Sequence, residues 1–134
     1  MAENGRNQVR DPRTYAIVAA AKEVHDALGS GFLEPVYQEA LAVEFGRQGV
    51  PFARQVALPV VYRGQPLNAS FCADFVCFGT VLVEVEVREA VSEREEAWVV
   101  NGLKAARLEV GVVLNFGGAS LEHRRLVSEV VSAR

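Results

Sequence analysis

The sequence predicts a single α/β domain (α+β in looser usage) with the element order α-α-β-β-β-α-β. Its 134 residues suit one domain and are too few for two. Half of the residues are apolar, which is enough to build a substantial core. Along the chain, the hydrophobic period changes from helical spacing to strand alternation and back. We therefore divide the chain into a polar N-terminal arm, residues 1–10, and one domain, residues 11–134.

Two helices are predicted at the start of the domain. Asp11-Pro12 is a typical helix start, because Asp accepts hydrogen bonds from free N–H groups and Pro tolerates the first helical position. This helix ends at Gly29. The second helix begins at Glu34-Pro35 and ends at Gly49, where we expect a left-handed cap. Helical spacing predicts the buried faces: Ile17, Ala21, Val24 and Leu28 in the first helix, and Val36, Tyr37, Ala40, Leu41, Val43 and Phe45 in the second.

The middle of the chain predicts a hairpin followed by a third strand. Residues 55–62 and 67–78 are predicted strands, joined by a turn over residues 63–66. Pro59 indicates an edge position or a bulge, because proline cannot donate to a strand ladder. Residues 80–88 form the clearest strand, since they are rich in β-branched side chains and alternate strictly toward the end.

The last third of the chain predicts a helix and one further buried strand. The helix covers residues 93–107, and the strand covers residues 111–116, which Gly117-Gly118 terminates. The segment near residues 123–127 fits either a last strand or a short helix, and the two alternatives for the tail over 119–134 stay open.

Composition excludes several classes of protein. The net charge of −3 argues against a generic DNA-coating role. Two cysteines, Cys72 and Cys77, cannot build a disulfide framework or a four-ligand zinc site, and we expect both in the core on opposite faces of one strand. No apolar run approaches the ~20 residues of a membrane span. The first residues also lack the apolar stretch of a signal peptide, so we expect a cytoplasmic protein of bacterial type.

An acidic pattern lies on the clearest strand. Alternation places Glu84, Glu86 and Arg88 on one face, opposite the valines. Asp74, in the preceding strand, is placed across from Glu84. Two carboxylates at that separation repel unless a cation lies between them, and oxygen ligands of this type suit Mg²⁺ or Mn²⁺. The alternative is a half-exposed strand with a solvated acidic face, which spacing alone favours.

Several motifs resemble one family. Gly31-Phe-Leu-Glu34-Pro-Val-Tyr37 matches the pattern that names the GxxExxY proteins. Other similar segments follow in order between about residues 14 and 127: Glu23-Val-His25, Leu28-Gly29-Ser-Gly31, Phe71-Cys-Ala-Asp74, Val81-Leu-Val-Glu84, Glu96-Ala97, Asn101 with Leu103, and Leu114-Asn-Phe-Gly117. This family is assigned to the PD-(D/E)XK nuclease-like superfamily. The resemblance implies a central mixed sheet flanked by helices.

The resemblance also implies roles for three acids. Glu34 matches the acidic residue of the first core helix, which helps hold a divalent ion or its water. Asp74 matches the aspartate that bridges metal, and Glu84 matches the first acid of the Glu-x-Lys element, also a metal ligand. In active relatives the metal and the lysine lower the pKa of a water and stabilise charge on the scissile phosphate.

The chain departs from this pattern at Glu86, which stands where relatives have the lysine. One outcome is a catalytic set of Glu34, Asp74, Glu84 and Glu86, in which Glu86 is a metal ligand or general base. The other outcome is a dead site in which Glu86 pairs with an arginine, either Arg88 or Arg54. Without cations, four carboxylates would repel one another severely.

A second departure favours the dead site. Glu95-Glu96-Ala97-Trp98 stands where relatives read roughly His-Glu-Ala-Gln, so the supporting His and Gln are replaced and an indole takes the place of an amide. We therefore expect a nuclease-like protein with a degenerate site, acting as a non-catalytic binding or structural module in an oligomer or larger assembly. The alternative is a nuclease that depends on Mg²⁺ or Mn²⁺; without activity no cofactor is implied.

The same composition bears on partners. An apolar fraction of 50% in so small a chain leaves surface hydrophobics to cover, so the expected partner is a second copy or another protein. Nucleic acid is the other partner class, and no membrane is expected. We also expect Tyr37 to pack the second helix while its hydroxyl finds a polar partner. His25 is expected either to support the Glu34 corner or to be a satisfied, partly buried histidine.

Overall fold

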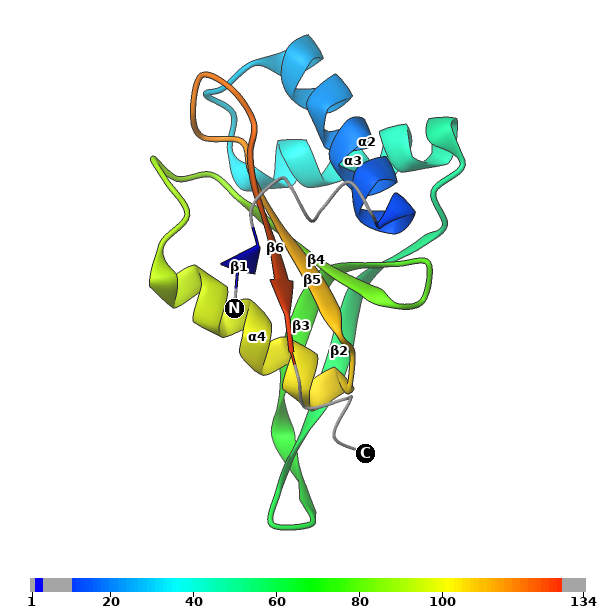
Figure 1. The fold of residues 1–134 in the computed structure, drawn as a ribbon, viewed down its shortest axis with the longest axis vertical. Coiled ribbons are helices and arrows are strands. Elements are labelled where there is room, and N and C mark those ends of the chain that lie inside the picture. Colours follow the sequence, from blue (N-terminus) through cyan, green and yellow to red (C-terminus); the bar gives the residue numbers. More distant parts are fainter. Residues whose placement is uncertain (1, 4–10, 129–134) are drawn as a thin grey trace.

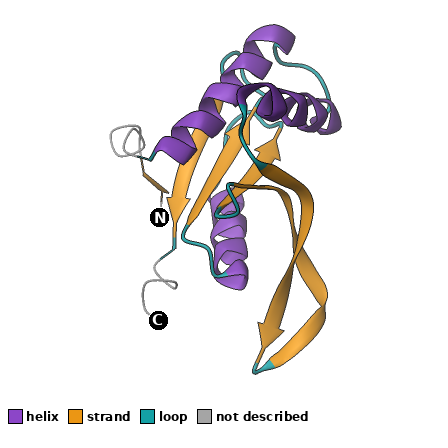
Figure 2. Cartoon of the chain, turned by 90° about the vertical axis from the view of Figure 1, so that its right-hand side faces the viewer, coloured by secondary structure: helices purple, strands orange, loops and turns teal. Residues whose placement is uncertain are grey.

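The computed structural model describes residues 2–3 and 11–128. Their strands form one sheet in the order β1-β6-β5-β4-β3-β2, in which only β4 and β5 pair in parallel. Helices α2 and α3 cover one face of this sheet and α4 covers the other (Figures 1 and 2). The predicted fold class is therefore confirmed. The elements are β1 (Ala2–Glu3), α2 (Pro12–Leu28), α3 (Glu34–Gln48), β2 (Phe52–Tyr62), β3 (Gln65–Cys77), β4 (Val81–Glu86), α4 (Glu93–Ala106), β5 (Val110–Asn115) and β6 (Glu122–Val127).

Helices α2 and α3 begin and end where local chemistry predicts. The Asp11 side chain accepts hydrogen bonds from the backbone N–H groups of Arg13 and Thr14, and Gly49 caps α3 with φ 76° and ψ 24°. Tyr37, Leu41 and Phe45 are fully buried, as predicted. The prediction is wrong for Val36 and Val43, which are 39% and 64% exposed. They lie on a neighbouring face of α3 that is turned to solvent, so the buried stripe is narrower than the apolar one.

The loop before α3 is fixed by the motif tyrosine. The Tyr37 hydroxyl donates to the carbonyl oxygen of Gly29 at 2.6 Å and accepts from the N–H of Phe32 at 3.3 Å. Its ring stacks on Phe116 at 4.6 Å, which confirms the expected packing role. His25 also stacks on Phe116, and its Nε2 lies 3.0 Å from the oxygen of Gly118. Of the two alternatives for His25, the structure shows the satisfied buried histidine.

The predicted hairpin is present, with a shorter turn. Arg63 and Gly64 both have positive φ, 51° and 80°, and Tyr62 pairs directly with Gln65. This is the conformation of a two-residue hairpin turn with the twist of the flanking strands. Residues 65–66, expected in the turn, therefore belong to β3. The register shifts between Pro59 and Val61, and β2 is an edge strand, so both expectations for Pro59 are confirmed.

The second half of the chain completes the sheet. Helix α4 starts with a capping box between Ser92 and Glu95, and it connects the parallel strands β4 and β5. Of the two alternatives for the tail, the structure shows the strand, because β6 pairs with the open edge of β5. Ala2–Glu3 of the predicted arm pairs with β6 in turn. The rest of that arm, residues 1 and 4–10, and residues 129–134 of the predicted domain lie outside the described residues.

Two apolar clusters form the core, one on each face of the sheet. The larger joins α2 and α3 to the sheet, and the smaller lies beneath α4. Cys77 is buried in the larger cluster, but Cys72 is exposed, so the expectation that both cysteines are core residues is wrong. Cys72 lies on the part of β3 that pairs only with β2, where its thiol faces Gln55. Among the described helices, none has the length and apolarity needed to cross a bilayer.

Candidate active site

Asp74 and Glu84 face each other where the pairing of β3 with β4 stops. The backbone register runs from Cys77 opposite Val81 to Phe75 opposite Val83. Beyond that point, side-chain carboxylates accept hydrogen bonds from the backbone N–H groups of the neighbouring strand. The N–H of Asp74 donates to Oε2 of Glu84 at 2.8 Å, and the N–H of Val85 donates to Oδ2 of Asp74 at 2.8 Å. The two acids are therefore cross-strand neighbours, as the alternation of the strands predicts.

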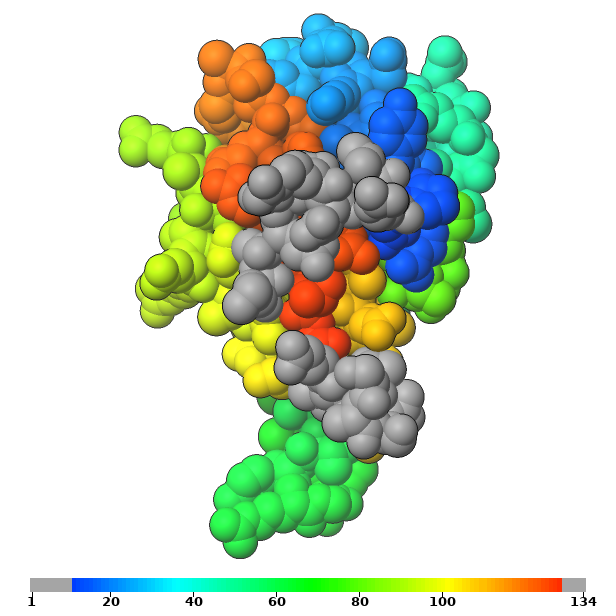
Figure 3. All heavy atoms as spheres, in the orientation of Figure 1, coloured from blue at the N-terminus to red at the C-terminus, as the bar shows by residue number. Residues whose placement is uncertain are grey.

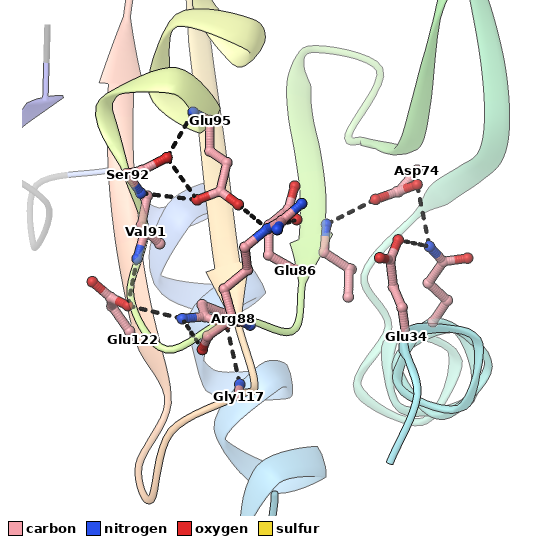
Figure 4. A network of polar contacts seen from close by, with 12 residues as sticks. Glu34, Asp74, Glu86, Arg88, Val91, Ser92, Glu95, Gly117 and Glu122 are labelled. Atoms are coloured by element: carbon pink, nitrogen blue, oxygen red, sulfur yellow. Dashed lines mark hydrogen bonds and ion pairs between the residues drawn. The ribbon is translucent and has the colours of Figure 1, made fainter. Parts of the chain in front are cut away.

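Glu34 reaches this pair from the first turn of α3. Gln38, one turn further along α3, connects this helix to β3. Its Nε2 donates to Oε2 of Glu34 at 2.9 Å and to Oδ1 of Asp74 at 3.2 Å (Figure 4). Gln38 was not predicted as a site residue. The available signal was its spacing of four from Glu34, which places both side chains on one helix face.

Glu86 lies at the end of β4 and pairs with Arg88. The Nε of Arg88 lies 3.5 Å from Oε1 of Glu86, and it also pairs with Oε2 of Glu95 (Figure 4). The other oxygen of Glu95 accepts from the N–H of Ser92 at 2.8 Å. Of the two arginines considered for Glu86, Arg88 is the partner. Arg54 instead lies over the Phe75 ring, and its charge partly offsets the burial that raises the pKa of Asp74.

The backbone of Arg88 is fixed by a buried asparagine. Oδ1 of Asn115 accepts from the N–H of Arg88 at 2.9 Å, and Nδ2 of Asn115 donates to the oxygen of Arg88 at 3.1 Å. The same amide donates to Oε1 of Glu122 at 2.9 Å. Gly117 passes so close that a Cβ there would lie 2.1 Å from the oxygen of Arg88. No site role was predicted for Asn115, although a polar residue at the end of a buried strand is itself a signal.

Burial and like charge raise the pKa of the two acids on β4. For Glu84, burial and then the charge of Asp74 raise the pKa to about 8, while a hydrogen bond from the Trp98 side chain acts in the opposite direction. For Glu86, burial and then the charges of Glu95 and Glu34 raise the pKa to about 7, against the effect of Arg88. Glu84 and Glu86 therefore titrate well above the ordinary range of a carboxyl group.

The other two acids are shifted in the same direction. Burial raises the pKa of Asp74, although the hydrogen bond from Val85 opposes this. Burial and the charge of Asp74 raise the pKa of Glu34. The charge of Asp74 therefore raises the pKa of Glu34, Glu84 and Glu86. We call Glu34, Asp74, Glu84 and Glu86 the acidic cluster.

Trp98 connects the acidic cluster to the surface of α4. Its ring stacks on Phe71 with a centroid distance of 4.5 Å and an interplanar angle of 28°. The side chain remains 49% exposed, and it lowers the pKa of Glu84 against the larger effect of burial. The indole, expected to replace a supporting amide, therefore reaches the acid that the resemblance assigns to metal.

The acidic cluster has the donor chemistry of a divalent-metal site without its complete geometry. Carboxylate oxygens suit Mg²⁺ or Mn²⁺. Within residues 2–3 and 11–128, however, no three His, Cys, Asp or Glu side chains are grouped so that they could hold a metal ion. One oxygen each of Asp74 and Glu84 is directed at a backbone N–H instead. The arrangement therefore does not fit a preformed metal centre.

Comparison with known proteins identifies one family. The model of the PD-(D/E)XK nuclease superfamily matches residues 11–126, from the cap of α2 into β6. Comparisons with curated proteins and with solved structures gave no match. The matched range includes the whole acidic cluster and covers most of the chain. The chain belongs to the PD-(D/E)XK nuclease superfamily.

Proposed function

We propose that this chain is a nuclease-fold module that has lost phosphodiester hydrolysis and acts by binding. The observation that carries the proposal is the ion pair of Glu86 with Arg88, at the position where the resemblance implies a lysine. A lysine there would position the attacking water and offset charge on the phosphorus. A carboxylate supplies no positive charge for either task.

Arg88 does not replace that lysine. Its guanidinium is already shared between the carboxylates of Glu86 and Glu95, so its charge is offset within the protein. Arginine also stays protonated at any physiological pH and cannot exchange a proton with water. The cation nearest to Glu86 is thus placed to neutralise acids of the protein, which supports a structural role.

The charge balance of the acidic cluster also supports the proposal. Burial raises the pKa of Asp74, Glu84 and Glu86, and the charge of Asp74 raises the pKa of the other two further. A phosphodiester carries its own negative charge and would be repelled by the ionised cluster. The cluster lowers that repulsion by holding protons, and a protonated carboxyl group is a poor base.

A cleavage assay with a matched baseline tests the proposal. The full chain is incubated with single- and double-stranded DNA and RNA in Mg²⁺ and in Mn²⁺, beside the Asp74→Ala variant purified in the same way. We expect equal, background-level cleavage by both proteins. Cleavage by the unaltered chain that needs the metal and disappears in Asp74→Ala would overturn the proposal.

A nuclease dependent on Mg²⁺ or Mn²⁺ is the second candidate, with Glu34, Asp74, Glu84 and Glu86 as its site. It is favoured by the repulsion within the acidic cluster, which a bound divalent cation would relieve. Calorimetric titration with Mn²⁺ tests it. This candidate requires metal-dependent cleavage and Mn²⁺ binding that weakens in Glu84→Gln. Equal heat signals from the unaltered protein and from Glu84→Gln would exclude Mn²⁺ binding at the acidic cluster.

A further inference from the structure

A groove separates the β2–β3 hairpin from the C-terminal half of α4. Its volume is about 750 Å³. The hairpin extends well beyond the rest of the sheet, so one wall of the groove projects from the body of the molecule (Figures 1 and 3). We call it the hairpin groove. Phe71, Trp98, Lys104 and Arg107 are among the residues that line it.

The walls of the hairpin groove are positive in a chain that is negative overall. None of the residues that line the groove is an Asp or a Glu. Two cations, Lys104 and Arg107, line it, while the whole chain has a net charge of −3. An anionic ligand is therefore attracted to this side of the molecule.

An aromatic platform lies in the same groove. Trp98 stacks on Phe71, and about half of its surface is exposed. Phe71 is held from behind by Gly102 of α4, where a Cβ would lie only 2.6 Å from the Phe71 ring. Two stacked rings on a fixed support offer an exposed indole to a flat ligand.

Single-stranded nucleic acid satisfies both features at once. Its phosphates complement the cations, and its bases have flat faces that stack on aromatic side chains. Bases in a duplex are already stacked on one another, and an acidic peptide would leave the indole face without a flat partner. We propose that the hairpin groove binds single-stranded nucleic acid, with a base on Trp98 and the backbone passing Lys104 and Arg107. This inference names the ligand of the binding function proposed above, and it depends on that proposal.

Trp98 gives a direct readout, because it is the only tryptophan of the chain. The full chain is titrated with an unlabelled oligothymidylate of about 15 nucleotides, in EDTA so that no metal-dependent cleavage can occur. We expect saturable quenching of tryptophan fluorescence and weaker binding as salt rises. A duplex of the same length and polyglutamate are titrated in parallel, and we expect both to bind at least about fivefold more weakly because neither offers an unstacked base.

The two lysines of the chain provide a matched pair of variants. Lys104→Glu reverses a charge in the groove, and Lys22→Glu makes the same change at an exposed position of α2, on the opposite face of the sheet. We expect Lys104→Glu to weaken binding at least about fivefold and to reduce the salt slope by about 0.7 for each phosphate that the side chain no longer neutralises. Lys22→Glu should stay within about twofold of the unaltered protein.

Variants at Trp98 test the stacking. Trp98→Phe keeps an aromatic ring on Phe71, whereas Trp98→Leu removes it, so a labelled oligothymidylate should bind the leucine variant about fivefold or more weaker than the phenylalanine variant. Circular dichroism establishes that both are folded.

Several results would overturn the inference. They are absence of tryptophan quenching by the oligothymidylate, binding of polyglutamate as tight as that of the oligothymidylate, and a loss of affinity in Lys22→Glu equal to that in Lys104→Glu. Self-association that buries Trp98 would also overturn it and would assign the groove to a second copy. Binding in EDTA is measured independently of cleavage, so this test and the cleavage assay fail separately.

Discussion

Asp74 and Glu84 each bind the backbone of the strand that carries the other. The N–H of Asp74 donates to Glu84, and the N–H next to Glu84, that of Val85, donates to Asp74, both at 2.8 Å. The two acids repel through their charges and hold β3 and β4 together through their oxygens. The strands need acceptors at this point, so the two acids have a structural role that does not depend on whether phosphodiesters are cut.

Asp74→Asn and Asp74→Ala distinguish the hydrogen-bond acceptor role of the Asp74 side chain from the effect of its negative charge. Asparagine keeps an oxygen for the N–H of Val85, whereas alanine leaves that half-buried donor without its partner. We expect Asp74→Ala to lower the free energy of unfolding by about 1–3 kcal/mol. Asp74→Asn should remain within about 1 kcal/mol of the unaltered protein, because it loses the like charge beside Glu84. Denaturant unfolding measures both, and equal losses would contradict the bridging role.

The raised pKa values of Glu84 and Glu86 predict how stability depends on pH. Both folded-state values, about 8 and about 7, lie above the ordinary 4.5. Between these limits the folded protein binds more protons than the unfolded chain, so the free energy of unfolding falls as pH rises from about 4.5 toward 8. Glu84→Gln should flatten this fall in denaturant titrations at several pH values. Glu39→Gln, at an exposed position of α3, is the matched control. An unchanged slope in Glu84→Gln would contradict the assignment.

Two adjacent glycines provide a test of how Arg88 is positioned. A Cβ at Gly117 would lie 2.1 Å from the oxygen of Arg88 and 2.5 Å from its nitrogen, while one at Gly118 meets only the oxygen of Ser120 at 3.5 Å. We expect Gly117→Ala to cost about 1–3 kcal/mol or more, because two backbones must separate. Gly118→Ala should change stability by less than about 1 kcal/mol. Thermal or denaturant unfolding measures the difference, and two equally stable variants would refute this explanation.

Glu86→Lys tests whether a lysine at this position supports hydrolysis. The substitution replaces a carboxylate in the acidic cluster by the cation that the resemblance implies, so cleavage in Mn²⁺ should rise above the level of the unaltered chain if the rest of the site is intact. Glu86→Gln removes the negative charge without adding a positive one and is the control. An inert Glu86→Lys protein that still folds would mean that Trp98 or Glu95 has closed the site as well.

The elements of this fold follow from local chemistry that is visible in the sequence. Asp11 accepts bonds from the first N–H groups of its helix, Gly49 adopts the left-handed conformation, and Pro59 lies beside a bulge on an edge strand. Each of these preferences involves groups within a few residues of one another. Alternation along β4 likewise predicted that Asp74 and Glu84 would be cross-strand neighbours, because strand geometry alone sets which side chains can face each other.

Packing between distant segments settled what local patterns left open. Val43 and Cys72 are apolar but exposed, because no described helix or strand covers the faces on which they lie. Gln38 of α3 binds Asp74 of β3, 36 residues further along the chain, through a contact that the fold alone brings about. Local residue preferences set where helices and strands begin, end and alternate, since those forces act between near neighbours. Which surfaces are covered, which acid meets which cation and which strand edge the tail joins depend on elements far apart in the chain, and only the assembled fold sets them.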